Sequence, residues 1–167
     1  MADKARLTGG IVPRIAASWR RPGQVVRSLS PMSDPSQLAV LMGAMLIFLL
    51  AQSPGHARAA WLDPSVPLGG RIAGAVMALF FIMPLVAYAV AWVVAGLSRL
   101  TPSRISQSDS RLALFWALLA VGPAMLLSGL VEGMVGPGAA LSATRLLAGL
   151  GFIFIWGAGL RALSTRR

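Results

Sequence analysis

The residues that could carry acid–base or metal chemistry are few and far apart in this sequence. The chain has one histidine, His56, no cysteine, and five acidic residues. The acids are Asp3, Asp34, Asp63, Asp109 and Glu132. A zinc site or a bis-histidine haem site needs more nitrogen or sulfur ligands, and no two acids have a spacing suited to general acid–base catalysis. We therefore expect a protein that is not an enzyme, with no catalytic residue, no bound metal and no cofactor.

Glu132 is the one ionisable residue that could lie inside a membrane, because it directly follows an apolar run in SGLVEGMVGPG. A buried carboxylate at that position could bind or relay a proton. The alternative is a position at the outer interface, close to Arg145 across a short loop. The scarcity of other polar groups in the neighbouring apolar blocks favours the interface position.

The composition is that of an integral membrane protein. Hydrophobic residues make up 56% of the 167 residues and charged residues only 12%, with a mean hydropathy of +0.74, whereas soluble domains have about 25% charged residues. Four apolar blocks could each cross a bilayer as a helix, at about residues 35–52, 70–97, 111–131 and 141–163. The sequence predicts an all-α integral membrane bundle of four transmembrane helices over residues 34–163. A cytoplasmic, amphipathic, Arg-rich segment over 1–33 precedes it, and a short basic tail over 164–167 follows.

Local signals set the boundaries of the first helix. Asp34 is expected to cap its start, and Ser53-Pro54-Gly55 is expected to end it. The following residues up to Gly69 then form an external loop, which contains His56 and the interfacial side chain of Trp61.

The positive charges are segregated along the chain. Three fall on one side, with Arg58 in the connection after the first block and Arg71 and Arg145 near the starts of the second and fourth blocks. The other twelve are Lys4, Arg6, Arg14, Arg20, Arg21, Arg27, Arg99, Arg104, Arg111, Arg161, Arg166 and Arg167. Because cytoplasmic loops are enriched in Lys and Arg, this distribution predicts a multi-pass protein of a bacterial inner membrane with both termini in the cytoplasm.

The stretch SWRRPGQVVRSL, residues 18–29, alternates apolar residues with arginines at helical spacing. We expect two short amphipathic turns in the inner headgroup layer, where Trp19, Arg20, Arg21 and Arg27 contact anionic phospholipid or a partner subunit. The alternative is that these arginines only set the topology. A nucleic-acid partner is not expected, because no recognition helix, RNA-binding sheet or zinc spacing accompanies the charges.

Small residues spaced four or two positions apart indicate where helices could approach each other closely. Ala87, Ala91 and Ala95 form such a row in the second span, and Gly149 and Gly151 lie in the fourth. These five residues are expected to make packing contacts, although alanine and glycine are abundant throughout this chain.

The layout resembles the Yip1 family of small multi-spanning membrane proteins. The resemblance lies in the segment from Trp19 to Leu29, in prolines at Pro84 and Pro123 midway along two spans, and in the helix RLALFWALLAVGPAMLL from Arg111 to Leu127. It implies a membrane organiser with a cytoplasmic N-terminal segment, whose eukaryotic relatives work with small GTPases in membrane traffic.

Two functional hypotheses follow. The first is a non-catalytic interaction protein, either an accessory or assembly subunit of a larger inner-membrane complex, such as a respiratory or photosynthetic one, or a Yip1-like organiser. The alternative is a small transporter or channel component that uses Glu132 and the helix breaks at Pro84 and Pro123.

Overall fold

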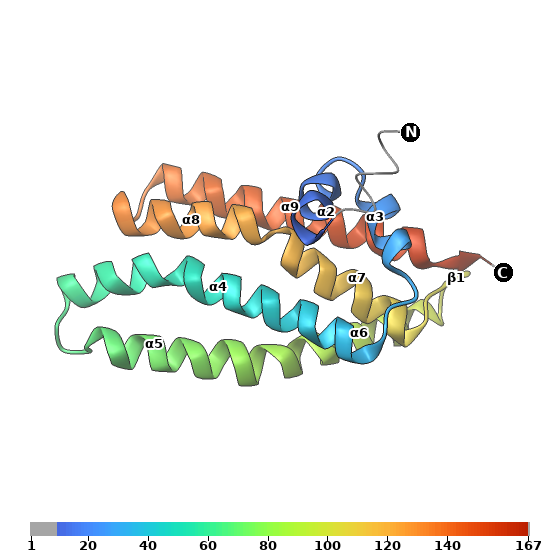
Figure 1. Ribbon diagram of the computed structural model, residues 1–167, viewed down its shortest axis with the longest axis horizontal. Coiled ribbons are helices and arrows are strands. Elements are labelled where there is room, and N and C mark those ends of the chain that lie inside the picture. Colours follow the sequence, from blue (N-terminus) through green and yellow to red (C-terminus); the bar gives the residue numbers. More distant parts are fainter. Residues whose placement is uncertain (1–9, 167) are drawn as a thin grey trace.

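The computed structural model describes residues 10–166 and is almost entirely helical (Figure 1). Asp3, Lys4, Arg6 and Arg167 lie outside the described residues. The helices are α2 (Ile11–Ser18), α3 (Pro22–Leu29), α4 (Asp34–Leu62), α5 (Leu68–Met77), the π-helical turn η1 (Ala78–Ile82), α6 (Met83–Ser98), α7 (Gln107–Ala120), α8 (Gly122–Met134) and α9 (Ala139–Leu163). Two short strands, β1 (Ser103–Arg104) and β2 (Thr165–Arg166), pair antiparallel and join the C-terminus to the α6–α7 connection.

The predicted all-α fold with membrane-spanning helices is confirmed. By length and composition, α4, α9 and the continuous helix over 68–98 are each long and apolar enough to cross a membrane. The pair α7 and α8 makes a fourth span if the two helices, bent by 40° at their junction, are counted as one.

The helices form two antiparallel hairpins that lie against each other (Figure 1). One hairpin is α4 with α5–η1–α6, the other is α8 with α9, and α4 packs along α8. The α4–α5 and α8–α9 connections lie together at one end. Helix α3, the α6–α7 connection and β2 lie toward the other end, while α2 lies beside the α7–α8 junction.

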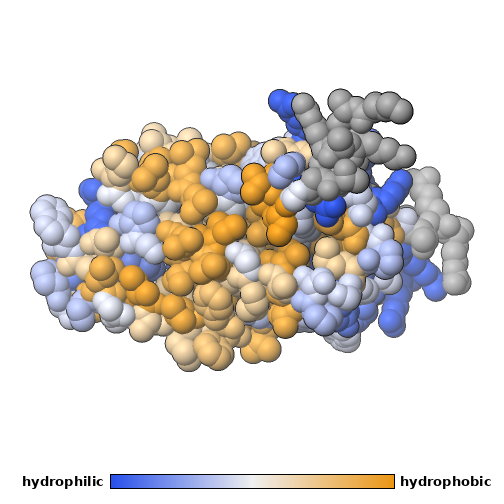
Figure 2. Space-filling model, in the orientation of Figure 1, coloured by the Kyte–Doolittle hydropathy of each residue, from blue (hydrophilic) through white to orange (hydrophobic). Residues whose placement is uncertain are grey.

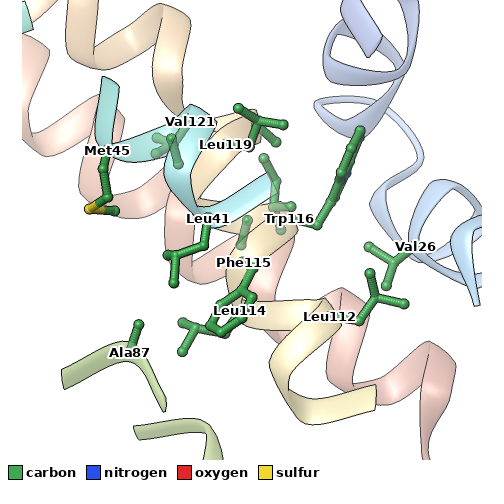
Figure 3. Packing of buried hydrophobic residues seen from close by; sticks show 14 of the residues in the cluster. Val26, Leu41, Met45, Ala87, Leu112, Leu114, Phe115, Trp116, Leu119 and Val121 are labelled. Carbon is green, nitrogen blue, oxygen red and sulfur yellow. The ribbon is translucent and has the colours of Figure 1, made fainter. Parts of the chain in front are cut away.

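Helix α7 is the core of the molecule. Its residues from Leu112 to Ala117 are buried, and Phe115 and Trp116 are 0% and 1% exposed. Figure 3 shows these side chains between Leu41 and Met45 of α4 on one side and Val26 of α3 on the other. A helix that is apolar on all faces must be covered on all faces, and here α4, α6, α9 and the N-terminal helices cover α7.

The first span does not end at Ser53-Pro54-Gly55, as the sequence predicts, but continues as α4 to Leu62. Pro54 costs a helical hydrogen bond, yet it packs directly against Gly133 of α8. Packing between the two helices therefore maintains the helix beyond the local stop signal. His56 and Trp61 consequently lie on α4, not in a loop.

The start of this helix also differs by one position, since Ser33 is the N-cap and Asp34 is already the first helical residue. Asp34 remains favourable there, because a carboxylate in the first turn interacts well with the helix dipole.

The prolines of the second and third spans have different effects. Pro84 lies just after the π-helical turn η1, and the helix continues through it. A wider turn before a proline accommodates its ring and its missing N–H. In contrast, the predicted third span over 111–131 divides at Val121, and Pro123 lies near the start of α8.

Candidate functional site

The N-terminal helices are built into the bundle. Ser18, Val25 and Val26 are completely buried, and Leu29 is 8% exposed. Helix α3 packs along α9, while α2 contacts α7 (Figure 1). The apolar side of α3 therefore faces protein, whereas Ile11 and Val12 of α2 remain exposed.

Trp19 joins this segment to the bend between α7 and α8. Its Nε1–H donates to the backbone oxygen of Ala120 at 3.0 Å. That carbonyl would normally accept from the N–H four residues later, but the N–H of Ala124 donates to Val121 at 2.9 Å instead. The Trp19 ring lies directly against Gly151 of α9, where a Cβ atom would overlap it. Trp19, predicted to contact lipid or a partner, thus contacts the chain's own helices.

Two further side chains hold the N-terminal helices in place. The indole N–H of Trp116 donates to the buried hydroxyl of Ser18 at 2.9 Å, and this hydroxyl donates to the backbone oxygen of Arg14 at 2.8 Å. Arg27 donates two hydrogen bonds, of 3.1 and 2.8 Å, to the backbone oxygen of Ala162. A cation is favourable there because the last turn of a helix presents unpaired carbonyls. Sequence reasoning missed the Ser18–Trp116 contact, which joins residues far apart in the chain.

The remaining two predicted contact residues, Arg20 and Arg21, lie on exposed positions of the α2–α3 connection. They belong to a larger group at the same end of the molecule. The arginines with described side chains in α2, α3, their connection, the α6–α7 connection and the adjoining parts of α7 and α9 are Arg14, Arg20, Arg21, Arg27, Arg99, Arg104, Arg111 and Arg161. We call this set the arginine-rich end.

Two described acids offset these eight arginines. Asp34 forms an ion pair with Arg111 at 2.7 Å, and Asp109 accepts hydrogen bonds from Ser30 and Ser106. Both carboxylates therefore have fixed partners. The opposite end carries three arginines and two acids among the described residues, so the two ends differ strongly in charge.

Two adjoining grooves lie at the arginine-rich end. The first, of about 720 Å³, runs between α3 and α9. It is lined by Arg21, Pro22, Gly23, Gln24, Arg27, Ser28, Phe154, Ala158 and Ala162. The second, of about 580 Å³, shares the last three residues and adds Ile153, Gly157 and Arg161. The first groove combines two guanidinium groups with an apolar wall, and the second combines one with such a wall.

Glu132 lies near the end of α8 that faces away from the arginine-rich end. Its Oε1 is 3.0 Å from Nη2 of Arg145, and the two side chains are 37% and 58% exposed. Its carboxyl group also lies against Gly55 of α4. This placement favours the interface position over a proton site at the centre of the bundle.

The small residues that the sequence singles out are placed differently from one another. Ala87, Ala91 and Ala95 are buried where α6 faces α7, and Ser110 of α7 donates to the backbone oxygen of Ala91 at 2.9 Å. Gly151 lies under Trp19. Gly149, in contrast, is exposed, with open space around the position of its Cβ.

Helices α4 and α8 approach each other closely. A Cβ atom on Gly129 would overlap the backbone of Ala51, and one on Gly133 would overlap Pro54. The four-residue spacing of these glycines is the sequence signal for this crossing, while its partner helix is visible only in the fold.

Comparison of this chain with protein-family models, with curated proteins and with solved structures finds no match, so the Yip1-like resemblance stays a prediction.

Proposed function

We propose that this chain is a non-catalytic integral membrane protein that serves as an accessory or assembly subunit of a larger bacterial inner-membrane complex, or as a Yip1-like membrane organiser. The observation that carries the proposal is the arginine-rich end. Its N-terminal part is held to the bundle by Trp19, Ser18 and Arg27, while Arg20 and Arg21 stay exposed.

A docked segment presents its charges without first having to fold. If the segment were a loose arm, ordering it on binding would cost conformational entropy and weaken the interaction. A segment that is already docked avoids this cost. Clustered guanidinium groups attract carboxylates and phosphates and select partners by charge. The complementary surface is therefore an acidic patch on another subunit or the anionic face of the membrane.

The apolar faces of the helices supply the second contact surface. Large side chains are exposed along η1–α6 and α9, including Phe81, Leu85 and Trp92 on the former and Leu146 and Leu150 on the latter. Figure 2 shows an apolar band across the middle of the molecule between more polar ends. In a bilayer this band meets lipid tails or the transmembrane helices of another subunit.

The orientation in the membrane follows from the charge difference between the ends. Because Arg and Lys are enriched on the cytoplasmic side, the proposal places the arginine-rich end and both termini in the cytoplasm. Glu132 and its partner Arg145 then lie at the outer side, which is a structural position and not a transport path.

The test is mild-detergent extraction of native membranes, followed by native electrophoresis and mass spectrometry of co-migrating proteins. Stoichiometric migration with a large complex would support the subunit role, and migration of the chain alone or only with itself would contradict it. The substitutions Arg20→Gln and Arg21→Gln should weaken co-migration. Arg71→Gln, at the opposite end, is the control and should leave it unchanged.

A further inference from the structure

We propose that the groove between α3 and α9 is a binding site for one anionic glycerophospholipid, with the headgroup at the arginines and an acyl chain along α9. The inference rests on the proposed membrane location and adds a defined ligand and site to it.

The groove exists because α3 and α9 cross at small residues. A Cβ atom on Gly23 would lie 3.2 Å from Cβ of Ala162 and 3.3 Å from the backbone oxygen of Ala158. Close contact at this point leaves a recess of about 720 Å³ beside it, with Phe154 on the α9 side. Its shape is therefore a property of the docked N-terminal helices and is absent from either helix alone.

The polar part of the groove suits a phosphodiester. Arg21 and Arg27 both line it. The hydrogen bonds from Arg27 to Ala162 use two of its five N–H groups and hold the guanidinium in place. A guanidinium so fixed presents its other donors to a phosphate at little entropic cost. The amide of Gln24 supplies a further donor toward ester or glycerol oxygens.

The apolar part distinguishes a lipid from a soluble anion. The adjoining groove continues along α9 from Arg161 to Gly157 and Ile153. Arg161 is eight positions after Ile153 in the helix, which is roughly 12 Å along the helix axis. Phe154 and Ile153 are 53% and 59% exposed. An acyl chain leaving a headgroup at the arginines would cover this surface, and it would run toward the middle of the bundle, as lipid tails do.

The first experiment measures binding of phosphatidylglycerol to the full chain, purified in neutral detergent, by native mass spectrometry. Phosphatidylcholine is the neutral comparison and should bind more weakly. Each arginine near an anionic headgroup accounts for about a fivefold change in affinity. The double variant Arg21→Gln/Arg161→Gln should therefore bind phosphatidylglycerol about 30-fold more weakly.

The control is the charge-matched double variant Arg71→Gln/Arg145→Gln at the opposite end, which should change binding less than twofold. An equal loss in both double variants would show attraction to net charge only and would overturn the proposal. Unchanged binding in the groove variant would overturn it as well. Ala158→Phe keeps every charge but fills the groove, so it should also reduce binding, and unaltered binding would again count against the site.

A measurement on the unaltered chain covers the case in which a variant fails to fold. Phosphatidylglycerol carrying a diazirine on its acyl chain should, after illumination, label α9 around Ile153, Phe154 and Gly157, which line the apolar part of the groove. Labelling spread evenly over the exposed apolar faces would overturn the proposal. Because the purified chain is used alone, failure to co-migrate with a complex would remove the subunit role and leave this result standing.

Discussion

The indole N–H of Trp19 should contribute measurably to the stability of the whole bundle. Ala120 is completely buried, and its carbonyl oxygen accepts from Trp19 because the bend directs the N–H of Ala124 to Val121. The substitution Trp19→Phe keeps an aromatic ring at this position but removes the donor, together with the outer indole atoms that lie against Gly151. The buried carbonyl is then left without this hydrogen bond.

Leaving a buried acceptor without its partner costs about 1–3 kcal/mol. A value near the middle, about 2 kcal/mol, corresponds to a fall in the melting temperature of about 4–8 °C for a protein of this size. The assay is thermal unfolding of the full chain in detergent, followed by far-ultraviolet circular dichroism.

The matched control is Trp92→Phe. Trp92 lies on α6 and is 65% exposed, so its replacement should leave the melting temperature within about 2 °C, as expected for a surface change. Equal melting temperatures for the two variants would refute the argument that the bend depends on the indole of Trp19.

Three further outcomes are expected. Gly129→Ala should destabilise the bundle by about 1–3 kcal/mol, because its Cβ would overlap a backbone carbonyl of α4, whereas Gly149→Ala, in open space, should be neutral or slightly stabilising; equal unfolding midpoints would contradict this. Ala91→Leu should overpack the buried α6–α7 contact and lower the free energy of unfolding by a similar amount, about 1–3 kcal/mol. Val93→Leu, on the exposed face of α6, should leave it unchanged in the same unfolding assay. Hydrogen bonds from Ser65, and to a smaller extent the charge of Arg71, lower the pKa of Asp63 below its usual 3.8. A titration midpoint of the Asp63 carboxyl carbon at or above 3.8, measured by NMR, would contradict this.

The sequence alone predicts the positions of those helices whose signals are local. The predicted spans over 70–97 and 141–163 correspond closely to the helices over 68–98 and 139–163. Both are defined by continuous apolar composition, which a membrane protein displays without reference to its neighbours.

The extension of α4 beyond Pro54 could not be predicted in the same way. Proline and glycine in succession are a strong local stop signal. The helix continues because Gly133 and Glu132 of α8 lie against Pro54 and Gly55. This contact joins segments that are far apart in the sequence, so no local pattern contains it.

The position of the N-terminal segment illustrates a different limit. Its apolar residues have the spacing of an amphipathic helix, and such a face can be buried by lipid or by protein with the same composition. Val25 and Val26 are buried by protein. Two features favour protein over lipid here: Gly151 makes room for the Trp19 ring, and the carbonyl of Ala120 at the bend accepts its hydrogen bond. Both contacts exist only when the helices are assembled.

The central claim, that the N-terminal helices are a fixed part of the bundle, can be tested with one cross-link. The chain has no cysteine, so the double variant Gly23→Cys/Ala162→Cys carries the only two thiols. A Cβ on Gly23 would lie 3.2 Å from that of Ala162, close to the roughly 3.5–4.5 Å spanned by a disulfide. In mildly oxidised membranes we expect an intramolecular disulfide in nearly all molecules, detected by mass spectrometry of the joined peptides. The pair Gly69→Cys/Ala162→Cys, whose positions lie at opposite ends, should keep free thiols. Free thiols in both variants would contradict the docked arrangement and, with it, the fixed arginine-rich end.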